Sequence, residues 1–348
     1  MWGSPLILRD VEVCLPEDQL IKRWLLPLAS ACSSSGLTDD CCRLVCPEKY
    51  DLLVNVDALS EGIHFFAGDP WDLVARKALR VNISDLIAKG AKPFGYMFSL
   101  SLPTDWTEEA MDSLTMGLAI DQSEFGLILL GGDTITSVSG LTLAVTMFGL
   151  VPSFRVIPSR GNAKSGDIIY VSGTIGDAAI GLNLRKKQLH LDSNKLSDES
   201  IEYFLNRYLL PQPRVTLASV LLEYASAAMD VSDGFLVDMS RLCSASNLSA
   251  KVNVDVLPLS WHANMALELY PELIKNILTG GDDYELLFTV PKVRSAAFEE
   301  AAILLKESVT KVGEMLDKGT SPVLLYTERR SREAYFHECL KDPGYRHF

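Results

Sequence analysis

Positive charge is scarce in the first half of this sequence. The 348 residues carry a formal net charge of −13. Residues 1–154 contain 20 Asp and Glu against 10 Lys and Arg, and no Lys or Arg occurs from Pro93 to Phe154. Binding to nucleic-acid phosphates or to anionic lipids requires a basic face. The composition therefore argues against nucleic acid and membranes as partners. The acidic residues of the first half then form either a solvated surface or a site that binds cations.

Long apolar runs are also missing, since no stretch approaches the roughly 18 apolar residues of a membrane span. The first residues lack a basic region, and Arg9 and Asp10 interrupt their apolar run, so we expect no signal peptide. The count of 7 cysteines is odd, and we expect reduced thiols in the cytoplasm. Cys41, Cys42 and Cys46 cluster without CxxC spacing, which leaves a zinc site as a minor alternative.

The usual phosphate-binding loops do not occur, because the sequence contains neither GxxxxGK[ST] nor GxGxxG. The glycine-rich stretch "SGTIGDAAIGL" could hold an anion at the N-terminus of a helix, although this signal is weak. Arg160 and Lys164 are the candidates for phosphate contacts. An exposed basic loop is the alternative interpretation of these two residues.

The sequence does contain a repeated switch between strand and helix periodicity. Asp69 is expected to cap a helix that starts at Pro70 and ends at Gly90, and a second helix is expected over 107–125. Further helices are expected at 176–187, 215–226 and 234–246. The expected strands lie at 51–59, 94–103, 127–134, 140–151, 168–173, 251–259, 284–290 and 322–327, with another ending at Val231. The strand at 127–134 is expected to run into a turn at the glycines of "LLGGDT".

The elements alternate without the regular βαβ spacing of a doubly wound sheet, which predicts an α+β (mixed α/β) fold. At this length two domains are the natural expectation. The segment that follows residue 151 is rich in Pro, Ser and Gly. We therefore expect a first domain at 1–151 and a second domain at 152–348.

The stretch "MDVSDGFLVDM", residues 229–239, places three carboxylates among apolar side chains. They belong to Asp230, Asp233 and Asp238, and no Lys or Arg occurs between Arg214 and Arg241. An ionised carboxylate buried without a partner costs several kcal/mol or more. Asp238 lies on the following helix and is interpreted as a structural or helix-surface acid. The other two require a partner from elsewhere.

Similar acids recur beside apolar strands or tight turns. Each of them could be a helix cap or a turn residue, which Asp favours. Together they predict a site for Mg²⁺ rather than Zn²⁺, because they offer hard oxygen ligands and no His/Cys cluster competes. Mg²⁺ usually bridges carboxylates to phosphates, so a nucleotide is the expected companion. The acids are Asp40, Asp57, Asp85, Asp133, Asp230 and Asp233.

Several strings in the chain occur in the same order in one family. Spanning nearly the whole sequence, they resemble the bacterial thiamine-monophosphate kinases, of the superfamily that includes aminoimidazole ribonucleotide synthetase and selenophosphate synthetase. The strings are "DD" at 39–40, "VDALSEGIHF", "KALRVNISDLIAKGAKP", "LLGGDT", "SRGNAKSGDIIYVSGTIGDAAIGL", "LLPQPR", "MDVSDGFLVDMSRLCSAS", "GGDDYELLFTVP" and "GYRHF".

The resemblance implies a kinase that converts thiamine monophosphate to thiamine diphosphate with ATP and several Mg²⁺ ions. It implies two α/β domains, of which the first binds ATP and Mg²⁺ and forms a homodimer, while the second completes the site. The six acids above correspond to metal ligands. Nucleotide contacts correspond to Asp133, Arg160 and Ser232. Substrate contacts correspond to His64, Asp282 and Tyr345, with His64 orienting the acceptor rather than removing a proton.

Several positions depart from the family pattern. Thr38 replaces a Gly, Asn55 and Val56 replace Ser-Thr, Asp282 replaces a Glu and is one methylene shorter, and Arg346 replaces an Asp. Two alternatives therefore stay open at this point. The chain could be another ATP-dependent synthetase of the superfamily, or a nucleotide-binding paralogue without turnover.

Overall fold

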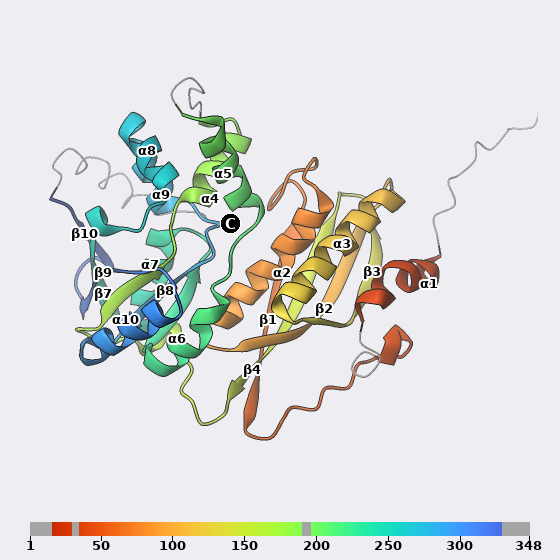
Figure 1. Cartoon of the computed structure of the whole chain (residues 1–348), viewed down its shortest axis with the longest axis horizontal. Helices are drawn as coiled ribbons and strands as arrows, with labels where there is room; N and C mark the ends of the chain where they lie inside the picture. The colour runs from red at the N-terminus through yellow and green to blue at the C-terminus, as the bar shows by residue number, and fades with distance from the viewer. Residues whose placement is uncertain (1–15, 30–34, 190–195, 329–348) are drawn as a thin grey trace, which may run out of the picture.

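The computed structural model describes residues 16–29, 35–189 and 196–328, which form two sheets and the helices around them (Figure 1). The N-terminal sheet has 4 strands in the order β1-β4-β2-β3. The C-terminal sheet has 6 strands in the order β10-β7-β9-β5-β8-β6. Both sheets contain parallel and antiparallel neighbours. The predicted mixed α/β fold is confirmed.

The strands are mostly short segments of apolar and β-branched residues. Those of the N-terminal sheet are β1 (Tyr50–Ser60), β2 (Lys92–Pro103), β3 (Ile128–Ser137) and β4 (Thr142–Pro152). Those of the C-terminal sheet are β5 (Ile168–Ser172), β6 (Ala227–Val231), β7 (Leu248–Asn253), β8 (Glu285–Val290), β9 (Val309–Asp317) and β10 (Val323–Tyr326). Segment 153–167 joins the two sheets, and the division into domains 1–151 and 152–348 stays a prediction.

The helices lie between the strands in the chain. They are α1 (Glu17–Leu20), α2 (Trp71–Ala88), α3 (Glu108–Phe125), α4 (Asp177–Arg185), α5 (Asp198–Leu209), α6 (Ala218–Tyr224), α7 (Phe235–Ser246), α8 (Trp261–Leu269), α9 (Leu273–Thr279) and α10 (Ser295–Leu304). Within the described ranges, none is long and apolar enough to cross a membrane.

Helix α2 connects the two halves of the molecule. It packs on β1, β2 and β4 on one side, and it also contacts β6, β8 and α6 of the C-terminal half. Most of its residues are buried, including the charged Lys77 and Arg80. A helix that is buried all round belongs to a core. One continuous core therefore runs from Met147 under α2 to Phe288 and Phe298.

The N-terminal sheet has one covered face and one open face. Leu143, Val145 and Met147 of β4 point toward α2 and are fully buried. The alternate residues of β1 are exposed on the other face, from Leu52 at 40% to Val56 at 63%, and Ile135 of β3 is also exposed. A contiguous exposed apolar surface marks an interaction site.

Three local predictions were wrong. The strand expected at 251–259 is β7, which ends at Asn253, and Val254–Val256 form a 3-10 turn. The N-cap of α2 is Pro70 rather than Asp69. Asp69 is buried before the helix, where it accepts a hydrogen bond from the Phe66 N–H at 2.8 Å and pairs with Arg185. The glycines of "LLGGDT" form no turn, because β3 continues through them to Ser137. A Cβ at Gly132 would lie 1.9 Å from the Phe98 carbonyl oxygen, so glycine here permits a close approach of β2.

Candidate functional site

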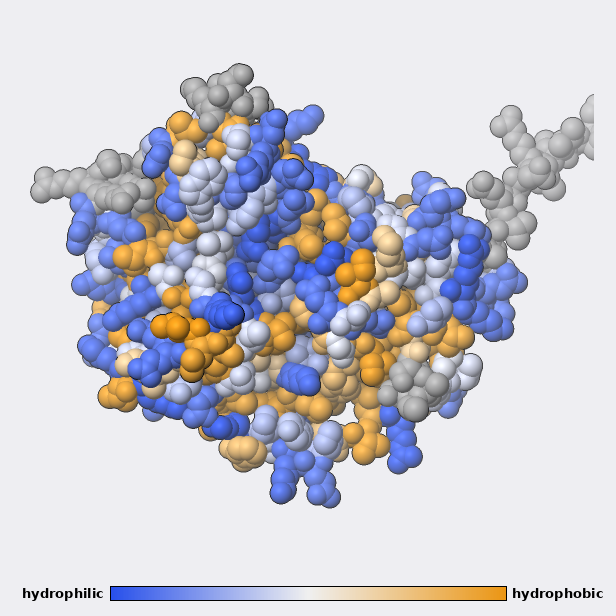
Figure 2. Space-filling model, viewed as in Figure 1, coloured by the Kyte–Doolittle hydropathy of each residue, from blue (hydrophilic) through white to orange (hydrophobic). Residues whose placement is uncertain are grey.

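The largest cavity that bears predicted residues lies where the two halves meet, and we call it the central cleft. It has a volume of about 520 Å³ and is lined from β1, α2, β6 and the loops at 232–234 and 279–284. Figure 2 shows hydrophilic residues gathered in this part of the surface. The cleft contains eight of the predicted site residues, namely Asp57, His64, Asp85, Arg160, Asp230, Ser232, Asp233 and Asp282.

Asp57 and Asp85 face each other between β1 and α2. The Asn82 side chain sets their spacing, since its Oδ1 accepts from the Asp57 N–H and from Asn55 Nδ2, both at 3.0 Å. Asn55 Nδ2 also donates to Asp85 Oδ2 at 3.1 Å. Burial, followed by the negative charge of Asp85, raises the pKa of Asp57 to about 7. This carboxyl therefore lacks a compensating positive charge.

Asp230 is the penultimate residue of the buried strand β6 and is 3% exposed. Burial, and then the charges of Asp85 and Asp238, raise its pKa well above the ordinary value. A cation would lower both this pKa and that of Asp57. The electrostatics of the cleft thus favour a positively charged ligand beside β1, α2 and β6.

Asp233 and Asp238 are neutralised by the chain itself, which corrects part of the sequence interpretation. Arg241 of α7 pairs with both carboxylates: with Asp238 one turn earlier in the same helix, and with Asp233 in the loop before it. Asp238 is fully buried rather than on a helix surface, and its Oδ2 accepts from the N–H groups of Ser232, Asp233 and Gly234 at 3.0, 3.0 and 3.2 Å. Asp238 is therefore structural, and it shapes the loop that presents Ser232 and Asp233 to the cleft.

The loop at 280–284 is pressed against the loop at 232–234. The Asp282 N–H donates to the Ser232 carbonyl and the Tyr284 N–H donates to the Val231 carbonyl, both at 2.8 Å. Asp282 and Tyr284 adopt positive φ angles of 69° and 51°. A Cβ at Gly281 would lie 2.1 Å from the Ser232 carbonyl oxygen, so only glycine fits there. This contact fixes Asp282 and Tyr284 in the wall of the cleft.

His64 lies in the loop after β1. Its Nδ1 accepts a hydrogen bond from the Ser60 N–H at 3.0 Å. In the neutral ring the proton is therefore on Nε2, which can donate to an anion. This geometry suits the orienting role that the resemblance implies, and it gives His64 no need to act as a base.

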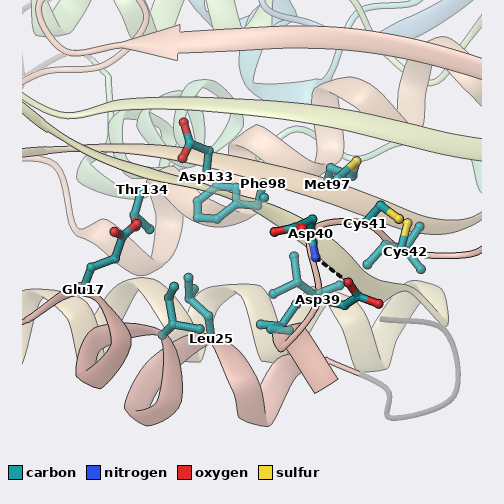
Figure 3. Close-up of a pocket in the computed structure, with 16 residues that line it drawn as sticks. Glu17, Leu25, Asp39, Asp40, Cys41, Cys42, Met97, Phe98, Asp133 and Thr134 are labelled. Carbon is teal, nitrogen blue, oxygen red and sulfur yellow. Dashed lines mark hydrogen bonds between the residues drawn. The ribbon is translucent and has the colours of Figure 1, made fainter. Parts of the chain in front are cut away.

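Asp40 and Asp133 lie elsewhere, in a second pocket of about 250 Å³ that we call the β3-edge pocket (Figure 3). The segment at 39–42, β3 and the first helical segment line it. In Figure 3 the two carboxylates lie on either side of Phe98 and do not point at each other. The Asp40 N–H donates to Asp39 Oδ1 at 2.8 Å, and Thr134 donates to Glu17 at 2.5 Å.

The order of the strands explains this separation. β1 and β3 form opposite edges of the N-terminal sheet, with β4 and β2 between them. Three strand spacings of about 4.8 Å place Asp57 and Asp133 on the order of 14 Å apart. Within one chain the structure brings four of the six predicted acids together and holds Asp40 and Asp133 apart.

The carboxylate oxygens of the central cleft suit a hard cation such as Mg²⁺ that is also bound by the phosphates of a ligand. Among the described residues no three His, Cys, Asp or Glu side chains are arranged to bind a metal by themselves. Asp57, Asp85 and Asp230 line the cleft with carboxylate oxygens, and the raised pKa values of Asp57 and Asp230 mark negative charge that the chain leaves uncompensated. Such hard oxygen ligands suit Mg²⁺, which usually takes its remaining ligands from water and phosphate.

Other expectations met different outcomes. The N-terminus of α4 is already occupied by an anionic group of the protein: the buried Asp283 carboxylate accepts hydrogen bonds from the Gly176 and Ala178 N–H groups at 2.6 and 3.3 Å. Lys164 is exposed and does not line the cleft. The Cys46 thiol donates to the Tyr50 carbonyl at 3.2 Å. Tyr345 and Arg346 lie outside the described residues.

Three cleft residues were missed in the sequence. Lys186 and Arg241 add positive charge to the lining, and Tyr284 adds a phenol. Lys186 follows an amphipathic helix and carries no distinguishing pattern. Tyr284 lies in a matched string but was interpreted as the first residue of a strand.

Comparison with known proteins defines the class of this fold and site. The family models of AIR synthase related proteins match at residues 38–151 for the N-terminal domain and at 164–324 for the C-terminal domain. A thiamine-monophosphate kinase of Caulobacter vibrioides is 38% identical over 301 residues, which cover 85% of this chain and 83% of that protein. The chain belongs to the thiamine-monophosphate kinase family.

Solved structures agree with this assignment. The crystal structure of a thiamine-monophosphate kinase from Stenotrophomonas maltophilia K279a is 33% identical, with a TM-score of 0.77, over 88% of this chain and 94% of that chain. A structure of AaThiL complexed with AMPPCP and TMP is 29% identical, with a TM-score of 0.70, over 92% of this chain and 96% of that chain.

Proposed function

We infer that this protein transfers the γ-phosphate of ATP to thiamine monophosphate and forms thiamine diphosphate. The observation that carries the inference is the central cleft, where unneutralised acids, Arg160 and Ser232 share one cavity with His64 and Asp282. The kinase family of the chain and the AaThiL complex with AMPPCP and TMP support it. ATP as co-substrate also supports a cytoplasmic location.

The chemistry asks little of the protein beyond positioning and charge. The terminal phosphate of thiamine monophosphate is already anionic near neutral pH, so it attacks without a general base. His64 Nε2–H orients this phosphate, while Arg160 and Ser232 contact the nucleotide. Asp57, Asp85 and Asp230 would hold Mg²⁺, and Asp233, one oxygen of which pairs with Arg241, would offer its other oxygen. The ion would supply neutralisation of the phosphate charge.

We further propose a homodimer that completes the site. The open face of the N-terminal sheet exposes apolar residues of β1 and β3, which a second copy would cover. A dimer that places the β3 edge of one protomer beside the β1 edge of the other would bring Asp40 and Asp133 to the partner's central cleft. All six acids would then serve one nucleotide, although they are separated within one chain.

Mixed dimers test this arrangement. Chains carrying Asp133→Asn and chains carrying Asp57→Asn are each expected to be inactive. After mixing and re-association, half of the dimers are heterodimers, and each contains one intact site. Activity should therefore recover to roughly a quarter of the wild-type value. If mixing restores nothing while sedimentation shows heterodimers, each site belongs to a single chain.

The function itself is tested by product analysis. The purified chain is incubated with ATP, Mg²⁺ and thiamine monophosphate, and ADP and thiamine diphosphate are measured together. Equal amounts of the two products support the proposal. ADP release only with a ribonucleotide amide would indicate a synthetase of the superfamily, and nucleotide binding without any turnover would indicate a non-catalytic paralogue.

A further inference from the structure

The side chain of Lys77 is one of the least exposed charged groups of the protein, and it is not explained by the fold alone. Lys77 lies on α2, and its side chain is 2% exposed. A buried ammonium is costly unless it is paired and hydrogen-bonded. The groups that contact the Lys77 ammonium therefore show which segments of the chain it holds together.

The Lys77 ammonium contacts three different segments of the chain. Its Nζ lies 3.1 Å from Asp282 Oδ1 in the loop before β8, and it donates to the His64 carbonyl at 3.3 Å in the loop after β1. It also lies 4.0 Å from the ring centroid of Tyr208 on α5. The Tyr208 hydroxyl donates to the same His64 carbonyl at 3.0 Å.

Two of these partners are the described residues that the proposed function assigns to the acceptor. His64 belongs to the N-terminal half and Asp282 to the C-terminal half, so their separation depends on how the two halves are joined. A single buried cation bound to both loops fixes this separation. Since an ammonium offers three N–H donors, these contacts together satisfy it.

The pair also determines how Asp282 is presented. Its side chain is 23% exposed and lines the cleft, and its Oδ1 contacts Lys77, so Oδ2 is not used by this pair. An unpaired carboxylate there would repel the phosphate of the acceptor. Paired with Lys77, it keeps an oxygen that can accept a hydrogen bond from an amino group, such as the one on the pyrimidine of thiamine.

We propose that Lys77 is a positioning residue for the acceptor site, which holds His64 and Asp282 at the separation that thiamine monophosphate requires. The inference rests on the proposed function and deepens it. It gives Lys77 no contact with ATP and no role in the chemical step. It therefore predicts an effect on acceptor binding that is separate from any effect on nucleotide binding or on folding.

The test is Lys77→Met, which removes the ammonium and keeps most of the stem. The KM for thiamine monophosphate should rise roughly 10- to 100-fold, as expected for hydrogen bonds to a charged group, with a much smaller change in kcat. The KM for ATP should stay within about twofold. The matched control is Arg76→Met. Arg76 is the preceding residue, and it pairs with Asp121 and Glu124 of α3, away from the cleft. This control should leave both KM values unchanged.

A charge-neutral variant keeps the inference testable if Lys77→Met does not fold. Lys77→Met combined with Asp282→Asn should fold, and its KM for thiamine monophosphate should rise less than the product of the two single effects, because both changes remove the same ion pair. Additive effects of the two changes would overturn the inference. So would an unchanged KM for thiamine monophosphate, or an equal loss of ATP binding, in Lys77→Met.

Direct binding separates this inference from the proposed function. Calorimetric titration with thiamine monophosphate in the absence of ATP should show binding to the wild type and weaker binding to Lys77→Met. If the wild type does not bind thiamine monophosphate, the proposed function fails and this inference with it. If the wild type and Lys77→Met bind equally well, the proposed function stands and only the role of Lys77 is refuted.

Discussion

The raised pKa of Asp57 predicts that Mg²⁺ binding to the central cleft depends on pH. Burial and the neighbouring Asp85 raise this pKa to about 7. Mg²⁺ binds the ionised carboxylate, so a proton must leave when the metal binds. From about pH 6 to about pH 8 the ionised fraction rises from roughly a tenth to roughly nine tenths. The apparent dissociation constant for Mg²⁺ should therefore fall about tenfold, or ~1.4 kcal/mol.

Calorimetry without nucleotide measures this effect, because the protons of ATP then do not contribute. Titrations with MgCl₂ in two buffers of different ionisation enthalpy give the number of protons released. Asp57 should contribute close to one proton per metal at about pH 6 and roughly a tenth of a proton at about pH 8, and protons released by Asp230, whose pKa is also raised, add to these values. Asp57→Asn, which is nearly isosteric, should bind Mg²⁺ more weakly and release fewer protons, by the amount that Asp57 contributes. Equal Mg²⁺ affinity at the two pH values, with no proton release, would refute the reasoning.

The same group also sets the sign of a stability change. The pKa of Asp57 is higher in the folded protein than its ordinary value, so its neutral form stabilises the fold. This contribution is fully present below the ordinary pKa of 3.8 and is lost as the pH rises through about 7. The melting temperature of the metal-free protein should therefore fall between about pH 6 and about pH 8. Adding Mg²⁺ and a non-hydrolysable ATP analogue should raise the melting temperature more at the higher pH.

Three further predictions concern single residues. Asp133→Asn and Asp230→Asn should each lower kcat by roughly two orders of magnitude or more, measured by ADP release, and wild-type turnover in either variant would contradict the metal role. Arg80→Met breaks the ion pair between Arg80 and Asp121, whose side chains are 1% and 0% exposed, and should lower the free energy of unfolding by about 3–5 kcal/mol in denaturant titrations. The control is Lys22→Met, which breaks the exposed pair between Lys22 and Asp18 and should leave the free energy of unfolding within about 0.5 kcal/mol of wild type. Tyr345→Ala should raise the KM for thiamine monophosphate roughly 3- to 30-fold and leave the KM for ATP unchanged, and an unchanged acceptor KM would remove the tail from the site.

Much of the fold was visible in the sequence because local signals and tertiary packing agree there. The helix expected over 107–125 is α3, where Thr107 accepts from the Ala110 N–H at 3.2 Å as the N-cap and Gly126 ends the helix at φ 67°. The pattern failed where packing overrides local preference. Asp69 resembles an N-cap in sequence, but its carboxylate is used by Arg185, 116 residues later in the chain.

The candidate site was predictable in composition but not in arrangement. The acids were identified as a set because each stands beside an apolar strand or tight turn. Their division between the central cleft and the β3-edge pocket depends on the strand order, which periodicity does not contain. The role of Arg241 was missed because its pair with Asp233 depends on how the loop before α7 folds back toward the helix. Lys77 was missed because it reads as an ordinary helix residue until Asp282 is placed beside it.

The most direct test of the central claim is a single-turnover experiment with ATP labelled in its γ-phosphate. Enzyme in excess over the labelled ATP is mixed with Mg²⁺ and thiamine monophosphate, and the products are separated after one turnover. The proposed direct transfer predicts that the label appears in the terminal phosphate of thiamine diphosphate, in step with the formation of ADP. Label recovered as inorganic phosphate, with no labelled thiamine diphosphate, would contradict it.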